Sequence, residues 1–104
     1  MPTLTEWPFD QARNTATVTV RQVMDGSKPI LLVSHDLDDH GWQFLTGEDV
    51  STKNVMLVAL DNVVSKDLSL YELADMPPGW QATRKSIHEP WVRSLNPTEP
   101  SNDA

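Results

Sequence analysis

The segment Ile30–Leu45, ILLVSHDLDDHGWQFL, contains two apolar runs separated by a charged turn. The first run, Ile30–Ser34, is short and nearly continuous, which favours a buried strand over a helix. The second run, Gly41–Leu45, alternates so that Trp42 and Phe44 share one face. Together the runs predict a β-hairpin at the centre of the fold, with Trp42 and Phe44 in the core.

Three further segments outside this hairpin are typical of strands. Ala16–Val20 alternates with a period of two and contains β-branched residues, and Val55–Leu60 is another short apolar run. Trp80–Arg84 alternates after a Pro-Pro-Gly turn, and Trp91–Arg93 is a candidate for a short edge strand because it follows Pro90. This order of elements favours an antiparallel sheet of about four or five strands.

The sequence between the strands predicts short helices. Thr19–Gly26, which overlaps the first strand, has apolar residues at helical spacing and is an alternative short helix with Thr19 as its N-cap. Asp61 is the expected N-cap of one or two turns that end at Asp67 and bury Val63, Val64 and Leu68. The S-x-x-E pattern of Ser69–Glu72 is a capping box before a further apolar face. We therefore expect an α+β fold with one or two short helices on one face of the sheet.

The length of 104 residues corresponds to one domain. Residues 1–14 contain two prolines and two aromatic residues without a clear period, and they predict an irregular N-terminal arm. Residues 15–93 are the expected single α+β domain. Residues 94–104 place two prolines among polar residues, which predicts a disordered or extended C-terminal tail.

The composition limits the compartment and the class of partner. The chain has 15 Asp and Glu against 8 Lys and Arg, a formal charge of -7, so we expect neither nucleic acid nor an anionic membrane as a partner. There is no cysteine, so disulfides and thiolate metal sites are excluded. No transmembrane segment and no secretory signal is expected, because no long apolar run and no basic N-terminal region occur. These features favour a cytoplasmic protein, and its oligomeric state stays open.

The negative charge is concentrated in two turns. No Lys or Arg occurs between Lys28 and Lys53, and that stretch contains the residues that we expect to bind a basic protein partner: Asp36, Asp38, Asp39, Glu48 and Asp49. The predicted hairpin places the first three acids at its tip and the last two at the opposite end of the sheet. The five acids therefore need not form one patch.

The HDLDDH turn also suggests a second hypothesis, a small metal-dependent hydrolase. Imidazole and carboxylate side chains can hold zinc, manganese or iron, and the ligands would be His35, Asp39 and His40. Leu37 stands where the comparable hydrolase motif has a histidine, which favours an acidic turn without metal. We assign no catalytic residue, no metal and no cofactor. A third hypothesis is an accessory module with a ligand pocket of more than about 300 Å³ beneath the sheet.

The acidic turn leading into Gly41-Trp42-x-Phe44, the Gly-acid loop Gly47–Asp49 and the Pro-Gly-Trp turn before Arg84 also occur together in a known family. Over about residues 15–93 the chain resembles a bacterial domain of unknown function that is grouped with the immunity proteins of polymorphic toxin systems, the immunity protein 33 type. The resemblance implies a small, cytosolic, non-enzymatic protein that binds a toxin domain and occludes its active site. It carries over no catalytic residue.

Overall fold

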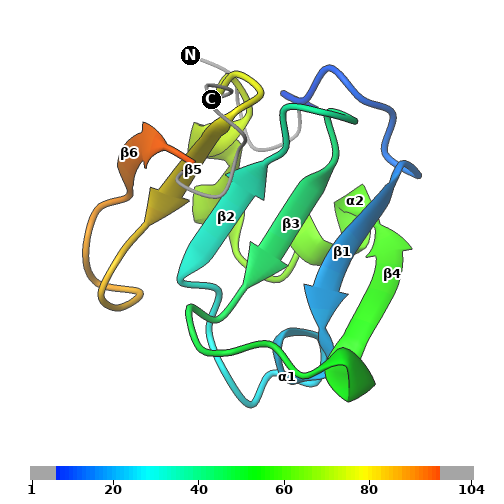
Figure 1. Ribbon diagram of the computed structural model, residues 1–104, viewed down its shortest axis with the longest axis vertical. Coiled ribbons are helices and arrows are strands. Elements are labelled where there is room, and N and C mark those ends of the chain that lie inside the picture. The colour runs from blue at the N-terminus through cyan, green and yellow to red at the C-terminus, as the bar shows by residue number, and fades with distance from the viewer. Residues whose placement is uncertain (1–6, 97–104) are drawn as a thin grey trace, which may run out of the picture.

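Six strands form one mixed sheet in the computed structural model, which describes residues 7–96 (Figure 1). The chain is a small α+β domain, as the sequence predicts. The strands lie in the order β4-β1-β3-β2-β5-β6. Their bounds are β1 (Ala16–Val20), β2 (Leu32–His35), β3 (Trp42–Leu45), β4 (Val55–Ala59), β5 (Trp80–Thr83) and β6 (Val92–Leu95).

The central β2–β3 hairpin pairs in the register Val33 with Phe44 and His35 with Trp42. The hairpin inserts between β1 and β5, so β3 lies beside β1, and this pair is parallel with Val18 opposite Gln43. The expected antiparallel sheet of four or five strands is therefore wrong in two respects, since one pair is parallel and there are six strands. The chain reverses twice between β1 and β3, so these two strands run in the same direction.

The helices are short and lie mainly on one face of the sheet. Figure 1 shows α2 (Leu60–Val64) and the 3₁₀ helix η2 (Leu68–Leu73) behind the sheet. At one end of the sheet lie α1 (Arg21–Met24) and the 3₁₀ helix η1 (Thr52–Asn54). Within residues 7–96 no helix has the length and apolar character needed to cross a membrane.

The core lies between the sheet and the α2–η2 layer. Trp42 and Phe44 are almost completely buried, as their alternation predicts. They belong to a cluster that also contains the buried Val33, Ala82, Leu60, Val63, Val64, Leu70, Leu73 and Met76. Leu68, expected in the core, is instead exposed because it begins η2 and lies outside the packed layer.

The helix caps differ from the sequence expectation. Val20 is the N-cap of α1 and makes no side-chain cap, because Thr19 belongs to β1 and its hydroxyl donates to the Phe44 carbonyl. Ala59 is the N-cap of α2, and Asp61 lies in the first turn. Asp67 caps η2 by accepting a hydrogen bond from the Ser69 amide at 3.0 Å. A carboxylate two residues before an amide can accept its hydrogen bond, so Asp67 pairs a backbone amide in the first turn of η2 as the expected serine cap would.

The described parts of the two terminal segments contact the sheet. Residues 7–14 contain no helix or strand, and the buried Phe9 packs edge-to-face on Trp42 with ring centroids 5.3 Å apart. At the other end, β6 continues to Leu95 and Asn96 is buried, so the structured part extends beyond the boundary expected at Arg93. The remainder of the expected arm and tail, residues 1–6 and 97–104, lies outside the described residues.

Candidate functional site

The β2–β3 connection forms an acidic tip, defined here as Asp36–His40, at one end of the sheet (Figure 1). The Asp36 amide donates to the Gly41 carbonyl at 2.8 Å and closes the base of the turn. The Asp39 carboxylate accepts from the Gly41 amide at 2.8 Å, and His40 has a positive φ of 58°. Asp, His and Gly suit these positions because Asp side chains stabilise turns and His tolerates the left-handed region better than most residues do.

Asp36 is held by the sheet and is less available than its neighbours. Its two carboxylate oxygens accept from the Ser34 hydroxyl at 2.7 Å and from the Gln43 amide at 2.8 Å. Asn96 in turn donates to the Ser34 hydroxyl at 2.7 Å. This network fixes the end of β2, and Asp36 therefore supports the tip rather than extending from it.

Four tip residues are exposed to solvent, and they include His40. Leu37, Asp38 and Asp39 are all exposed, and Leu37 has 49% of its surface accessible. No ion pair of either aspartate is found within residues 7–96. The tip therefore presents one apolar side chain followed by two carboxylates that no cation in the described part of the chain neutralises.

Glu48 and Asp49 lie at the other end of β3, as the hairpin predicts, and do not join the tip. Glu48 forms an exposed ion pair with Lys28, at 2.5 Å between Oε1 and Nζ. Asp49 is exposed and has no ion pair among those formed within residues 7–96. The five expected binding residues thus form two separate acidic groups, of which the tip carries more uncompensated charge.

The three side chains of the metal hypothesis do not converge. His35 is buried and stacks on Trp42 with ring centroids 4.0 Å apart, and its Nδ1 lies 2.7 Å from the Met76 carbonyl oxygen. A carbonyl only accepts, so Nδ1 donates the proton, and Nε2 is left buried without a hydrogen-bond partner. His40 is exposed, with its ring 6.4 Å from that of His35. In the part of the chain described, no three His, Cys, Asp or Glu side chains are placed to hold a metal ion.

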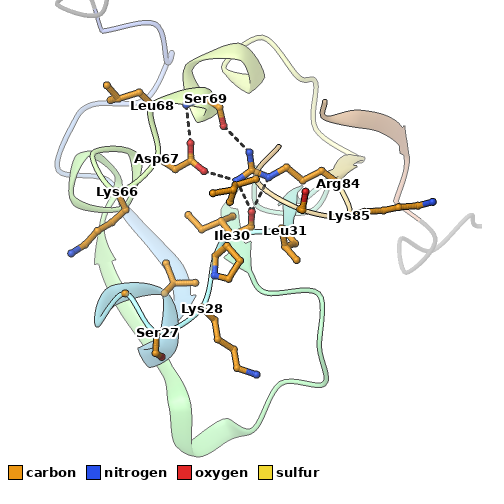
Figure 2. A pocket seen from close by; sticks show the side chains of 15 residues that line it. Ser27, Lys28, Ile30, Leu31, Lys66, Asp67, Leu68, Ser69, Arg84 and Lys85 are labelled. Atoms are coloured by element: carbon orange, nitrogen blue, oxygen red, sulfur yellow. Dashed lines mark hydrogen bonds and ion pairs between the residues drawn. The ribbon is translucent and has the colours of Figure 1, made fainter. Parts of the chain in front are cut away.

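An open groove of about 930 Å³ lies near the start of β2 and the end of β5. Its walls include Ile30, Leu68, Ile87 and three lysines. Figure 2 shows that these lysines, Lys28, Lys66 and Lys85, point away from one another and away from the groove centre. Its volume is above the roughly 300 Å³ that the ligand-pocket hypothesis requires. However, the groove lies at the end of the sheet and not beneath it, and it lacks the convergent polar groups that usually orient a ligand.

Arg84 occupies the floor of this groove and is fully engaged by the protein (Figure 2). Its guanidinium donates to the Ile30 carbonyl at 2.9 and 3.1 Å, to the Ser69 hydroxyl at 3.2 Å and to the Asp67 carboxylate. The guanidinium also lies over the ring of Trp91, 4.2 Å from its centroid. Arg84 therefore connects the sheet to η2 and is a structural residue. No local sequence pattern predicts this role of Arg84, because its partner Asp67 is 17 residues away in the sequence.

The Arg84–Asp67 pair predicts acid sensitivity. Burial raises the pKa of Asp67, but hydrogen bonds from Arg84 and Ser69 outweigh this effect and hold the pKa below its ordinary value of 3.8. The stabilisation is therefore complete above the unfolded-state pKa and is lost as the pH falls through the lower folded-state pKa. Urea unfolding at pH 3 to 7, compared with Asp67→Asn, should show a constant free-energy difference above roughly pH 5 that shrinks below roughly pH 4. A difference that stays unchanged to pH 3 would contradict this assignment.

Comparison of the chain with protein-family models, with curated proteins and with solved structures finds no match. The resemblance to the immunity protein 33 type therefore stays a prediction, and the candidate site rests on the geometry of the described residues. By that geometry, the acidic tip is the strongest candidate for an interaction surface.

Proposed function

We propose that this chain is a non-enzymatic protein-binding domain that uses its acidic tip to contact a basic surface of another protein. The observation that carries the proposal is the exposed Leu37 followed by Asp38 and Asp39, neither of which forms an ion pair within residues 7–96. Protein interfaces typically combine an apolar anchor with polar groups at its rim. Such a tip would insert Leu37 into a shallow apolar site while its two carboxylates meet Lys or Arg side chains.

The base of the tip is suited to binding because it is ordered before any partner arrives. Asp36 is held by Ser34 and Gln43, and the turn is closed by the bond between Asp36 and Gly41. A preorganised loop loses less conformational entropy on binding than a mobile one. Asp38 and Asp39 would chiefly accelerate encounter with a cationic partner, since rim charges act mainly on the association rate.

The second acidic group, Glu48 and Asp49, could also contact a basic partner, but at another surface. Asp49 contributes an exposed charge, whereas Glu48 is partly neutralised by Lys28. We therefore assign Glu48 and Asp49 a smaller role than the tip, which they cannot join because they lie at the opposite end of β3.

The partner that we propose is a basic toxin domain, which the chain would neutralise as an immunity protein in the bacterial cytoplasm. This part of the proposal is supported by the resemblance of residues 15–93 to the immunity protein 33 type and by the charge of -7. A binding protein of this kind needs no catalytic residue. The proposal therefore depends on a partner surface that is complementary in charge.

The proteins encoded by the genes that flank the gene of this chain are the probes for this proposal. Each is purified and titrated against the full chain by isothermal titration calorimetry at low and at high salt. We expect one of them to bind, with the affinity falling about tenfold between roughly 50 and 500 mM NaCl because salt screens the exposed carboxylates. Absence of binding to every flanking product, or an affinity independent of salt, would contradict the proposal.

A further inference from the structure

The strand β4 is one edge of the sheet, and its outer side is uncovered in the described structure. Its sequence, VMLVA, contains no charge and no proline. Val55, Met56 and Leu57 are all exposed, and 73% of the Leu57 surface is accessible. Natural sheets usually protect such an edge with charged residues, proline or a bulge, because its free backbone groups can pair with another strand.

The backbone groups that face outward can be identified from the pairing with β1. The Leu60 amide donates to the Thr15 carbonyl at 2.8 Å, and the Thr17 hydroxyl donates to the Val58 carbonyl at 3.0 Å, so Leu60 and Val58 face β1. In an antiparallel ladder every second residue faces the same neighbour. The intervening residues Val55, Leu57 and Ala59 therefore face the free edge, but the Val55 amide already donates to the Thr52 carbonyl, and the Ala59 carbonyl accepts the first hydrogen bond of α2 because Ala59 is its N-cap. The groups left free at the edge are the Val55 carbonyl, the Ala59 amide and both backbone groups of Leu57.

We propose that β4 pairs antiparallel with β4 of a second copy of this chain, about a two-fold axis at Leu57. In this register Leu57 lies opposite Leu57 of the second copy, and each Val55 lies opposite Ala59 of the other copy. The two Leu57 residues then exchange two hydrogen bonds, each Ala59 amide donates to the Val55 carbonyl of the other copy, and the two sheets become one continuous sheet. The contact uses the same surface on both copies, so it closes as a dimer and does not propagate.

The charges beside β4 are complementary in the same register. Lys53 and Asp61 lie on opposite sides of Leu57, each four positions from it in the sequence. The antiparallel arrangement brings Lys53 of one copy to the same end of the paired strands as Asp61 of the other. Neither residue forms an ion pair within residues 7–96, so both are available for a contact between copies. This complementarity selects a second copy over an unrelated strand.

The opposite edge of the sheet is less suited to this pairing. The strand β6 contains Arg93, which forms an ion pair with Asp75 at 2.6 Å and donates to the Glu72 carbonyl at 2.8 Å. A charge on an edge strand disfavours pairing with a further strand. The structure therefore offers Leu95→Lys on β6, where Leu95 is 68% exposed, as a matched control for Leu57→Lys on β4.

Sedimentation equilibrium of the full chain between about 10 μM and 1 mM tests the proposal. We expect a reversible monomer–dimer equilibrium that Leu57→Lys weakens at least about tenfold, because two lysines then face each other across the axis. Leu95→Lys should leave the equilibrium unchanged, and circular dichroism should show that both variants are folded. A monomer throughout this range, or a dimer indifferent to Leu57→Lys, would overturn the proposal.

Exchanging the charges of Lys53 and Asp61 tests the proposed register of the two β4 strands. Lys53→Glu should weaken the dimer about fivefold by placing like charges together, and the double variant Lys53→Glu, Asp61→Lys should restore it. Hydrogen exchange should show slower exchange of the Leu57 and Ala59 amides at high than at low protein concentration. Failure of the exchanged pair to restore the dimer, or protection of these amides independent of concentration, would overturn the two-fold pairing at Leu57.

Discussion

Replacing Arg84 with methionine should reduce the free energy of unfolding by about 3–5 kcal/mol, as expected when one member of a buried ion pair is removed. The Arg84 side chain is only 2% exposed, and its guanidinium satisfies the Ile30 carbonyl as well as Asp67 and Ser69. Methionine fills a similar volume but removes the guanidinium donor of the Ile30 carbonyl and leaves the Asp67 carboxylate without its cation. Urea unfolding of the wild type and the variant at neutral pH measures the loss directly.

Two further variants separate the contribution of the ion pair from that of packing. Arg84→Met combined with Asp67→Asn should recover roughly 1–2 kcal/mol, because no carboxylate is then left there without a cation. Arg93→Met is the matched control and should cost less than about 1 kcal/mol, because the Arg93–Asp75 pair is exposed. Equal losses for Arg84→Met and Arg93→Met would show that Arg84 does not hold the sheet to η2.

Replacing Trp42 with alanine should also reduce the free energy of unfolding by about 3–5 kcal/mol. The indole ring is almost completely buried between His35 and Phe9, with ring centroids at 4.0 and 5.3 Å. Its Nε1 donates to the Gln11 side chain at 3.2 Å, and that side chain donates to the His40 carbonyl at 3.3 Å. The substitution therefore removes core volume and also loosens residues 7–14 and the acidic tip.

A conservative variant of Trp42 and a control variant at an exposed position are compared with Trp42→Ala. Trp42→Phe keeps most of the ring packing but loses the hydrogen bond to Gln11, so we expect a loss of about 1–2 kcal/mol. Leu95→Ala, at an exposed position of β6, should stay within roughly 0.5 kcal/mol of the wild type. Proteolysis should cut residues 7–14 faster in Trp42→Ala than in Leu95→Ala. Equal stability and equal cleavage of these two variants would contradict the assignment of Trp42 to the core.

The central hairpin could be predicted because its signals are local. A short apolar run, an acidic turn and the alternation around Trp42 and Phe44 identify two strands and the face that they bury. The parallel pairing of β1 with β3 could not be predicted in this way, since it depends on where the hairpin inserts. Periodicity determines which face of a strand is buried, but it does not determine which strand becomes its neighbour.

The candidate site was predicted only in part, for the same reason. The separation of Asp38 from Asp49 follows from the hairpin, because residues before and after β3 lie at its opposite ends. The engagement of Asp36 by Gln43 depends on side chains across the pair of strands, and the partnership of Arg84 with Asp67 joins segments that are distant in the sequence. Sequence spacing carries no information about such pairs until the fold brings them together.

The binding claim is tested most directly by the affinity of the double charge reversal Asp38→Lys, Asp39→Lys for the flanking gene product that binds the wild type. The matched control is Glu48→Lys, Asp49→Lys, which changes the net charge equally at the other end of β3. Calorimetry at low salt should show binding weakened at least about tenfold by the tip reversal and by less than about threefold by the control. Equal effects of the two reversals, or no effect of the tip reversal, would contradict binding through the acidic tip.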